Sequence, residues 1–416
     1  MKKMTSLENQ FLVYIDKHRR LLFAVFAIIV GLLIRWAGRD FVSLDMRDAL
    51  LPWFDQIKTA GGLPALSNQV GDYGLLYQTI ISLMTYVDIS PLYQYKLLSV
   101  VFDAALAIMA ALVYKDVKCN GLIVAGREVG HSATTNRESR ELILTQTVMV
   151  GALVWLLPTV MLNSAYWGQC DSMYSFFCLA TLYQLRRGSF VLAFVMLGLA
   201  FSCKLQTVFI MPFIVVYYLI TKRFSVFYIF ISLAVVWLMG IVAFAYGRSL
   251  LAPVLIYYGQ SSHYQLMYLS FPSFWILLGD DYFGFRWYAI FFTLCVVVAG
   301  MYACLNHKRF VTRGINYYTA VAWFIWSMVL FLPSMHDRYA YLMDLVLVLL
   351  ACLDRSFIKY AAVAVLSSLY FYGCFLFVQR DEAPILLAVV YLLAYLHFTR
   401  ALYVRLKDSD VQPSNH

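Results

Sequence analysis

The chain has 416 residues, of which 62% are hydrophobic and 13% are charged, whereas soluble domains carry roughly 25% charged residues. This composition excludes a soluble globular fold and predicts an all-α, polytopic membrane protein. The formal charge of +9 does not indicate nucleic-acid binding, because Lys and Arg are scattered in small groups at the ends of apolar segments.

Apolar stretches close to the ~20 residues that span a bilayer recur along the whole chain. They predict one integral membrane domain, residues 1–416, with about 12 crossings. The expected crossings are near 20–38, 94–114, 142–162, 171–186, 188–203, 206–221, 224–246, 286–304, 317–333, 340–353, 359–378 and 384–399. The stretch 74–90 is also apolar, but a crossing there would invert every later segment, so we expect a dipping or re-entrant helix.

The distribution of Lys and Arg predicts the orientation, because short cytoplasmic loops carry the excess of basic residues. Most of the 32 basic residues fall in one set of connections, which includes the N-terminus, the 115–141 loop and the C-terminal tail. We therefore expect both termini in the cytoplasm. The outer segments would then be 39–93, 163–170, 204–205, 247–285, 334–339 and 379–383.

The outer segment 39–93 is too long to be a mere connector. Within it, apolar residues recur at helical spacing between residues 46 and 58, opposite charged ones. The pattern predicts an amphipathic helix lying on the membrane surface, ended by Gly61-Gly62-Leu63-Pro64. The apolar residues are Leu50, Trp53, Phe54 and Ile57.

Asp45, Arg47 and Asp48 lie between the first crossing and this helix. A carboxylate held beside an arginine at the membrane surface could accept a proton from a hydroxyl group while staying ionised. The alternative is an ordinary helix N-terminus, with Ser43 or Asp45 as the cap and Asp48 in the first turn.

A second polar group, Asn163 to Ser172, interrupts two apolar stretches on the same side. Trp167, Gln169 and Asp171 could bind a sugar, the tryptophan by stacking and the others by hydrogen bonds to hydroxyl groups. The alternative is an interfacial turn in which Trp167 belongs to the aromatic belt and Asp171 caps a helix.

Two further outer positions carry cations. Lys204 has no acidic neighbour in sequence, so it is either a snorkelling lysine or an unpaired cation that holds a lipid phosphate. The turn around His336, Asp337 and Arg338 concentrates ionisable groups between hydrophobic helices, where they are costly unless they bind one another or a ligand. Arg338 could grip a phosphate with two donors.

Other acidic and histidine residues give weaker indications of function. Asp103 and Asp344 fall inside crossings, and we expect a buried hydrogen bond or ion pair between helices for each, with Lys96 and Arg338 as candidate partners. His263 belongs to an outer loop, 247–285, that could contact an acceptor. No metal-ligand spacing and no nucleotide fingerprint are present, and we favour no metal, although Asp45 and Asp48 could share a divalent ion.

The order of these groups resembles the GT-C glycosyltransferases, membrane enzymes that use polyprenyl-phosphate sugars. Asp45 follows the first helix, and Gly71-Asp72-Tyr73 is similar to the acidic-Tyr step of the dolichyl-phosphate-glucose glucosyltransferases. The segment 166–171 looks like the Trp-Gly-Gln-x-Asp signature of bacterial members. Lys204-Leu205-Gln206 resembles their Lys-Pro-Gln, and residues 336–339 resemble their His-Glu-Arg-Tyr. Leu205 replaces the usual Pro and Asp337 the usual Glu, which leaves the subfamily open.

The resemblance implies a catalytic module over residues 20–246, the outer loop 247–285 and C-terminal helices over 286–400. It implies inverting transfer of one sugar at the extracytoplasmic face, from a carrier such as undecaprenyl phosphate to a glycan or lipid-linked acceptor. By analogy with the bacterial members, we expect the protein in a bacterial cytoplasmic membrane. A transporter or flippase, or a polymerase or ligase of lipid-linked glycans, are the alternatives.

The resemblance also assigns roles to residues. Asp45 would be the catalytic base. The donor phosphate would be bound by Lys204, His336 and Arg338. The sugar or acceptor contacts, or their support, would come from Arg47, Asp48, Asp72, Tyr73, Trp167, Gln169, Asp171 and His263.

The predicted topology can be tested by labelling single cysteines in intact cells. An impermeant reagent should modify a cysteine at Gln69 and spare one at Ser132, because the basic residues around the second site predict a cytoplasmic location. Labelling of the second site without the first would contradict the topology.

Overall fold

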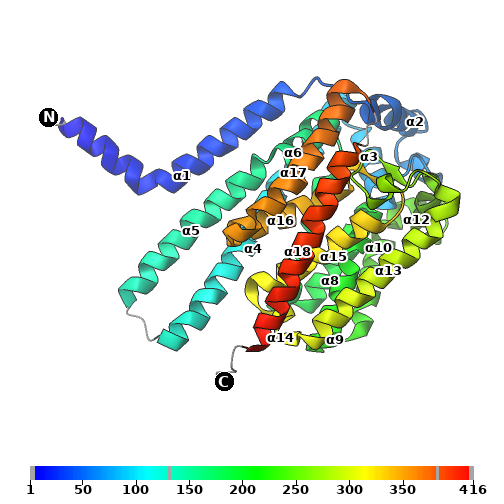
Figure 1. The fold of residues 1–416 in the computed structure, drawn as a ribbon. Coiled ribbons are helices and arrows are strands. Elements are labelled where there is room, and N and C mark those ends of the chain that lie inside the picture. The colour runs from blue at the N-terminus through cyan, green and yellow to red at the C-terminus, as the bar shows by residue number, and fades with distance from the viewer. Residues whose placement is uncertain (1–4, 130–132, 381–383, 412–416) are drawn as a thin grey trace.

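In the computed structural model the chain is almost entirely helical (Figure 1), as the composition predicts. The structure describes residues 5–129, 133–380 and 384–411, and among these it leaves out the side chains of 6, 120–138, 261–263 and 410–411. Ser132 and residues 381–383 of an expected outer segment therefore lie outside the described residues.

The helices fall into long and short elements. The helices of ten or more residues are α1 (Ser6–Ala37), α3 (Leu75–Met84), α4 (Pro91–Val129), α5 (Ala133–Trp155), α7 (Asp171–Arg187), α8 (Phe190–Cys203), α9 (Met211–Thr221), α10 (Ile229–Met239), α12 (Ala252–His263), α13 (Tyr282–Asn306), α15 (Gly314–Phe331), α16 (Tyr341–Leu353), α17 (Ile358–Gly373) and α18 (Ile385–Val411). The shorter α-helices are α2 (Leu51–Thr59), α6 (Pro158–Met161), α11 (Ile241–Ala245) and α14 (Lys308–Thr312).

Irregular helical turns and one minimal sheet complete the fold. The π-helical turns are η1 (Met46–Leu50), η3 (Leu162–Trp167) and η9 (Cys374–Val378). The 3-10 turns are η2 (Leu63–Ser67), η4 (Leu205–Ile210), η5 (Val226–Tyr228), η6 (Phe274–Leu277), η7 (Asp337–Ala340) and η8 (Arg355–Phe357). Two short parallel strands, β1 (Tyr268–Leu269) and β2 (Met335–His336), pair with each other.

Among the described residues, six helices are long and apolar enough to cross a membrane: α1, α4, α13, α15, α17 and α18. A seventh span is formed if α5 and α6 are counted together, although they bend by 45° at the break before Pro158, where proline interrupts the helical hydrogen bonds. The chain is therefore a helical, multi-pass membrane protein by length and composition.

All twelve predicted crossings coincide with helices, but several of these are shorter than a full span. For those, the prediction that they cross stays a prediction. The helix α3 has 10 residues, which is about 15 Å and too short to span the hydrocarbon by itself. The stretch 74–90 thus contains a short helix, and its dipping into the membrane stays a prediction.

Burial divides the bundle into a centre and a periphery. The helix α15 is 78% buried over its apolar window, whereas α1 and α13 are 17% and 22% buried. Large apolar side chains such as Phe26, Phe291 and Leu294 are exposed on these outer helices, and surfaces of this size would be unfavourable in water. The periphery therefore faces lipid, while α15 and α16 form the core.

The segments predicted to be cytoplasmic contact one another at one end of the bundle. Lys118 donates a hydrogen bond to the carbonyl of Leu353 (2.9 Å), and Arg405 pairs with Asp354 (2.6 Å). The predicted 115–141 loop is wrong in one respect, since α4 continues to Val129 and α5 begins at Ala133. The two helices run side by side and extend this end of the bundle (Figure 1).

The helix predicted after Asp45 is present, as η1 followed by α2, and it ends at Thr59 before the two glycines. Its apolar face does not lie on lipid, however. Leu50, Phe54 and Ile57 are 1–2% exposed, and Phe54 packs edge-on against Tyr95 of α4. The amphipathic pattern is satisfied by the protein core instead of by the membrane.

A buried ion pair joins α1 to α4, but the expected partner is wrong. Asp103 binds Arg35 at 2.8 Å, with exposed fractions of 0% and 4%, and accepts a bond from Ser164 at 2.5 Å. Lys96, the predicted partner, instead donates to backbone carbonyls after α1, including those of Gly38 (2.7 Å) and Phe41 (2.6 Å).

Asp344, the other acidic residue predicted inside a crossing, is buried in α16. Its expected partner, Arg338, lies near Asp45 instead. Among the described residues Asp344 has no cation within ion-pair distance. The expected ion pair is therefore wrong for Asp344.

Removal of one partner from the Arg35–Asp103 pair should destabilise the bundle strongly. Asp103→Ala leaves a buried, uncompensated guanidinium, which costs about 3–5 kcal/mol. Thermal unfolding of the purified protein in detergent measures this effect. The double variant Arg35→Met with Asp103→Leu should recover most of the stability, because no charge is then left buried.

The exposed pair Arg47–Asp48 provides the control. Asp48→Ala should shift the unfolding midpoint little, because exposed ion pairs contribute about 0–1 kcal/mol. Equal effects of Asp103→Ala and Asp48→Ala would show that the Arg35–Asp103 pair is not a structural support.

Candidate functional site

One cavity of about 930 Å³ is lined by residues from all four polar groups that the sequence places on the outer side. These groups are represented by Asp45, Gln169, Lys204 and Arg338. They come from segments far apart in sequence, so these segments lie at the same end of the molecule. The lining includes two carboxylates, three cations, three amides and a group of aromatic side chains. The polar and aromatic members are Asp45, Trp53, Asp72, Tyr73, Gln169, Lys204, Gln206, Phe209, Tyr258, Gln260, Tyr264, Tyr282, Arg286, Trp287, Ser334, Arg338 and Tyr339.

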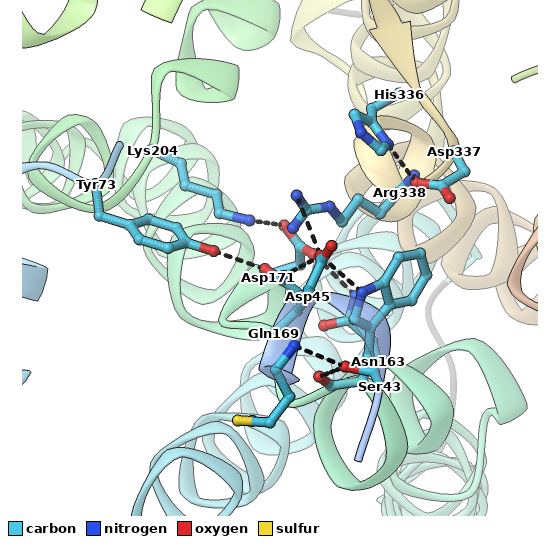
Figure 2. A network of polar contacts seen from close by, with 12 residues as sticks. Ser43, Asp45, Tyr73, Asn163, Gln169, Asp171, Lys204, His336, Asp337 and Arg338 are labelled. Carbon is cyan, nitrogen blue, oxygen red and sulfur yellow. Dashed lines mark hydrogen bonds and ion pairs between the residues drawn. The ribbon is translucent and has the colours of Figure 1, made fainter. Parts of the chain in front are cut away.

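Asp45 is the meeting point of this site. One of its oxygens, Oδ2, accepts hydrogen bonds from Trp167 Nε1 (2.8 Å) and Gln169 Nε2 (2.6 Å). The same oxygen lies 3.7 Å from Arg338 Nη2, as Figure 2 shows. The side chain is 26% exposed. Within the described part of the chain these contacts of Asp45 all use Oδ2, so Oδ1 is the oxygen left to meet a ligand.

The alternative interpretation, a helix N-terminus, is confirmed for Ser43 as the cap and for Asp48 in the first turn of η1, but not for Asp45. Its side chain makes no capping hydrogen bond. The neighbouring Ser43 takes that role, because its hydroxyl accepts from the backbone N–H of Met46 (3.1 Å) and donates to the carbonyl of Trp167 (2.8 Å). Because Ser43 caps the helix, the Asp45 carboxylate is available to the cavity.

For Arg47 and Asp48 a supporting role in the site stays a prediction. They pair with each other at 2.7 Å and are 61% and 59% exposed, and neither lines the cavity. Arg338, from the other half of the sequence, takes the place expected for Arg47 beside Asp45. The sequence could not reveal this exchange, because Arg338 is far from Asp45 along the chain and only the fold brings the two together.

A short hydrogen-bond relay orients the amide of Gln169. Tyr73 donates to Gln169 Oε1 at 2.8 Å, which turns the amide nitrogen towards Asp45. Burial raises the pKa of Tyr73 well above its ordinary value, so the phenol keeps the proton that it donates. The turn itself depends on Gly168, which has a positive φ of 79° and would meet Met46 if it carried a Cβ atom.

Trp167 supports the carboxylate and offers no face to a ligand. Its side chain is fully buried and stacks on Phe375, with ring centroids 4.5 Å apart. Trp167 is therefore not part of an aromatic belt at the membrane interface. A sugar cannot stack on its ring, because neither face is exposed. Among the expected roles, support of the site fits the geometry.

Lys204 is paired, contrary to its interpretation as an unpaired cation. Its ammonium lies 2.5 Å from Asp171 Oδ1, and both side chains are almost fully buried. Asp171 Oδ2 accepts from Asn163 (2.8 Å), and its side chain caps no helix. Lys204 still lines the cavity, but most of its charge is balanced by Asp171.

Arg338 has unused donors. Its Nε and Nη1 are buried and have no hydrogen-bond partner among the described residues, and the guanidinium lies 5.7 Å from the centre of the Trp167 ring. Burial opposes its charge, but the Asp45 and Asp171 carboxylates raise the pKa of Arg338 well above its ordinary value. A buried, permanently charged group with free donors is suited to an anionic ligand.

His336 lies on the same turn but has a different contact. Its Nδ1 binds Asp337 Oδ1 at 2.7 Å, and the same oxygen accepts from the backbone N–H of Arg338. The ring packs against Tyr264 and Tyr339 and does not line the cavity. Direct phosphate binding by His336 thus stays a prediction, while its observed contact orders the turn that carries Arg338.

The pairing of β1 with β2 brings part of the 247–285 segment against this turn.

Asp72 lines the cavity, and its backbone carbonyl accepts a hydrogen bond from Gln260. The side chain of His263, the last residue of α12, lies outside the described residues. Within the described chain, no three His, Cys, Asp or Glu residues are grouped to hold a metal ion.

Sequence reasoning missed several cavity residues, of which Arg286 and Gln260 are the most polar. Gln260 gives no recognisable signal, because amides are common in loops. Arg286 does give one. It begins an apolar crossing on the predicted outer side, where the positive-inside rule expects few basic residues.

The unused donors of Arg338 predict that the cavity binds a phosphate group. Inorganic phosphate or pyrophosphate should raise the unfolding temperature of the wild-type protein. Arg338→Ala should weaken this binding about 10- to 100-fold, because a charged hydrogen bond contributes about 1.5–3 kcal/mol. Arg338→Lys should recover only part of it, since the two-pronged donor is lost. Arg47→Ala is the control, and an equal loss in this variant would remove Arg338 from the site.

No known protein family model matches this sequence, and no curated protein sequence matches it either. The geometry of the cavity therefore carries the functional argument.

Proposed function

We propose that the chain is an inverting glycosyltransferase that moves one sugar from a polyprenyl-phosphate carrier to a glycan or lipid-linked acceptor. The observation that carries the proposal is the position of Asp45 and Arg338 on the wall of one cavity, 3.7 Å apart. Displacement at a sugar carbon needs a base for the attacking hydroxyl and a cation for the departing phosphate. These two side chains supply both.

In the proposed reaction, Asp45 Oδ1 takes the proton of the acceptor hydroxyl as that oxygen attacks the anomeric carbon. The bond between this carbon and the phosphate oxygen breaks, and its electron pair stays with the phosphate. Arg338 binds the phosphate, which gains one negative charge on leaving. The donor phosphate replaces Asp45 as the partner of Nη2, and attack from the opposite face inverts the configuration.

The rest of the wall suits a sugar attached to a lipid. Amides and aromatic rings, among them Gln206, Trp53 and Tyr264, can bind hydroxyl groups and the faces of a sugar ring. Apolar residues of the same cavity, such as Val208 and Ile290, can contact a prenyl chain. Ile290 belongs to α13, one of the helices that face lipid.

The finer assignment rests on the order of the sequence groups. Asp45, the 166–171 turn, Lys204 and Arg338 occur in the order of the GT-C groups, and their convergence in one cavity supports that resemblance. We extend the proposal to a bacterial cytoplasmic membrane, twelve crossings, cytoplasmic termini, an extracytoplasmic site and undecaprenyl phosphate as the carrier. No bound metal is part of the proposal.

A lipid transporter or flippase would use the same phosphate contact, but two observations favour a transferase. Transporters hold their substrate near the middle of the bilayer, commonly between repeated halves. Here the cavity is built largely from segments that connect helices, and no repeat is apparent in the sequence. A transporter also has no need for a carboxylate braced by three side chains.

Replacement of the base tests the proposal. Asp45→Asn keeps an oxygen that can accept from Trp167 and Gln169 but removes the charge that takes the proton. We expect single-turnover transfer to fall about 10²–10⁴-fold, the usual contribution of a general base. The assay uses purified protein and a panel of polyprenyl-phosphate hexoses and pentoses, with product detected by mass spectrometry.

Asp48→Asn is the matched control, because Asp48 is exposed, paired with Arg47 and outside the cavity. It should transfer at the wild-type rate. Wild-type turnover by Asp45→Asn would contradict the assignment of the base, and loss in Asp72→Asn alone would transfer that role to Asp72.

A further inference from the structure

Arg286 is the third cation of the cavity and differs from the other two. It lies in the first turns of α13, half-buried, and lines the cavity wall. Its guanidinium contacts the rings of Tyr282 and Trp287, at 5.5 and 4.5 Å from their centres. Among the described residues it has no hydrogen-bond or ion-pair partner.

The other two cations have carboxylates beside them. Lys204 is paired with Asp171, and Arg338 lies next to Asp45. The guanidinium of Arg286 has five N–H donors, and the described part of the chain offers no acceptor to any of them. A guanidinium at the edge of a membrane whose N–H donors are not used by the protein can bind a phosphate with them, so the arrangement points to an anion at this position.

The surroundings of Arg286 indicate that this anion is attached to a lipid. Trp287 and Tyr258 line the same cavity and are 65% and 75% exposed, on a part of the molecule whose helix α13 is mostly unburied. Aromatic side chains of this kind favour the boundary between headgroups and hydrocarbon. A phosphate held by Arg286 would therefore lie at headgroup depth, with its chain in the bilayer.

The volume of the cavity leaves room for a second substrate. At about 930 Å³ it is at the upper end of the range of roughly 300–1,000 Å³ that encloses a drug-sized ligand. One sugar phosphate needs only part of that space. The cavity can therefore hold the donor headgroup beside Asp45 and a second headgroup beside Arg286.

We propose that Arg286 forms a second phosphate subsite, which holds the phosphate or pyrophosphate of a lipid-linked acceptor. The inference rests on the proposed function. The donor phosphate must lie at the reacting carbon, next to Asp45 and Arg338, because its bond breaks there. The phosphate at Arg286 takes no part in the reaction, and no bond to it forms or breaks. It positions the acceptor so that a sugar hydroxyl reaches Asp45.

Binding stoichiometry tests the subsite without knowledge of the natural acceptor. Farnesyl phosphate is the probe, measured by native mass spectrometry and calorimetry on the full-length protein in detergent. The wild type should bind two molecules, and Arg286→Gln should weaken one step at least tenfold while leaving the other unchanged. Inorganic phosphate should bind Arg286 much more weakly than the lipid phosphate, and equal binding of both would contradict a lipid ligand.

Arg39→Gln is a matched control, because Arg39 also stacks on a tryptophan, Trp36, at 4.3 Å but has Asp40 as its partner. It should bind two probe molecules. A single probe molecule on the wild type, or two unchanged steps in Arg286→Gln, would overturn the subsite.

Transfer kinetics separate the acceptor from the donor. In Arg286→Gln, the KM for a polyprenyl-pyrophosphate acceptor should rise at least tenfold, with kcat and the donor KM unchanged. A rise in the donor KM instead would assign Arg286 to the donor. Absence of any transfer by the wild type would contradict the proposed function, and the acceptor role with it, whereas the binding result reports on the phosphate subsite alone.

Discussion

A single carboxylate oxygen, Asp45 Oδ2, connects three parts of the chain that are far apart in sequence. It receives hydrogen bonds from Trp167, the last residue of η3, and from Gln169 just after it, and lies beside the Arg338 guanidinium on η7. The second oxygen is thereby held in a fixed direction at the cavity wall. A base and a cation can act on one substrate only if the protein fixes the distance between them. In the proposed mechanism, this junction of Asp45, Trp167, Gln169 and Arg338 fixes that distance.

The junction depends on support from inside the bundle. The Arg35–Asp103 pair is bound to Ser164, which belongs to the same π-helical turn as Trp167. Lys204 and Asn163 hold Asp171 on the far side of that turn. Buried polar side chains in a membrane protein are stable when each of them forms a hydrogen bond or ion pair with another. The turn is therefore held from both sides, and with it the donors that orient Asp45.

The sequence was sufficient to identify which segments carry the site, and insufficient to identify which residues pair within it. Hydropathy, charge bias and motif order gave the helical class and brought Asp45, Gln169, Lys204 and Arg338 into one group. The partners of Asp103, Lys204 and Asp45 could not be predicted, because each lies more than 30 residues away. The apolar face of α2 was misassigned for a related reason, since a hydrophobic stripe does not tell whether lipid or protein covers it.

In the proposed mechanism, one carboxylate and one cation catalyse a single displacement at the anomeric carbon. The configuration of the newly formed glycosidic bond tests this mechanism, and NMR can determine it on the product from a polyprenyl-phosphate sugar of known anomeric form. A single displacement gives a product of opposite configuration to the donor. A product that retains the donor configuration would require a covalent or front-face route and would rule out the single displacement.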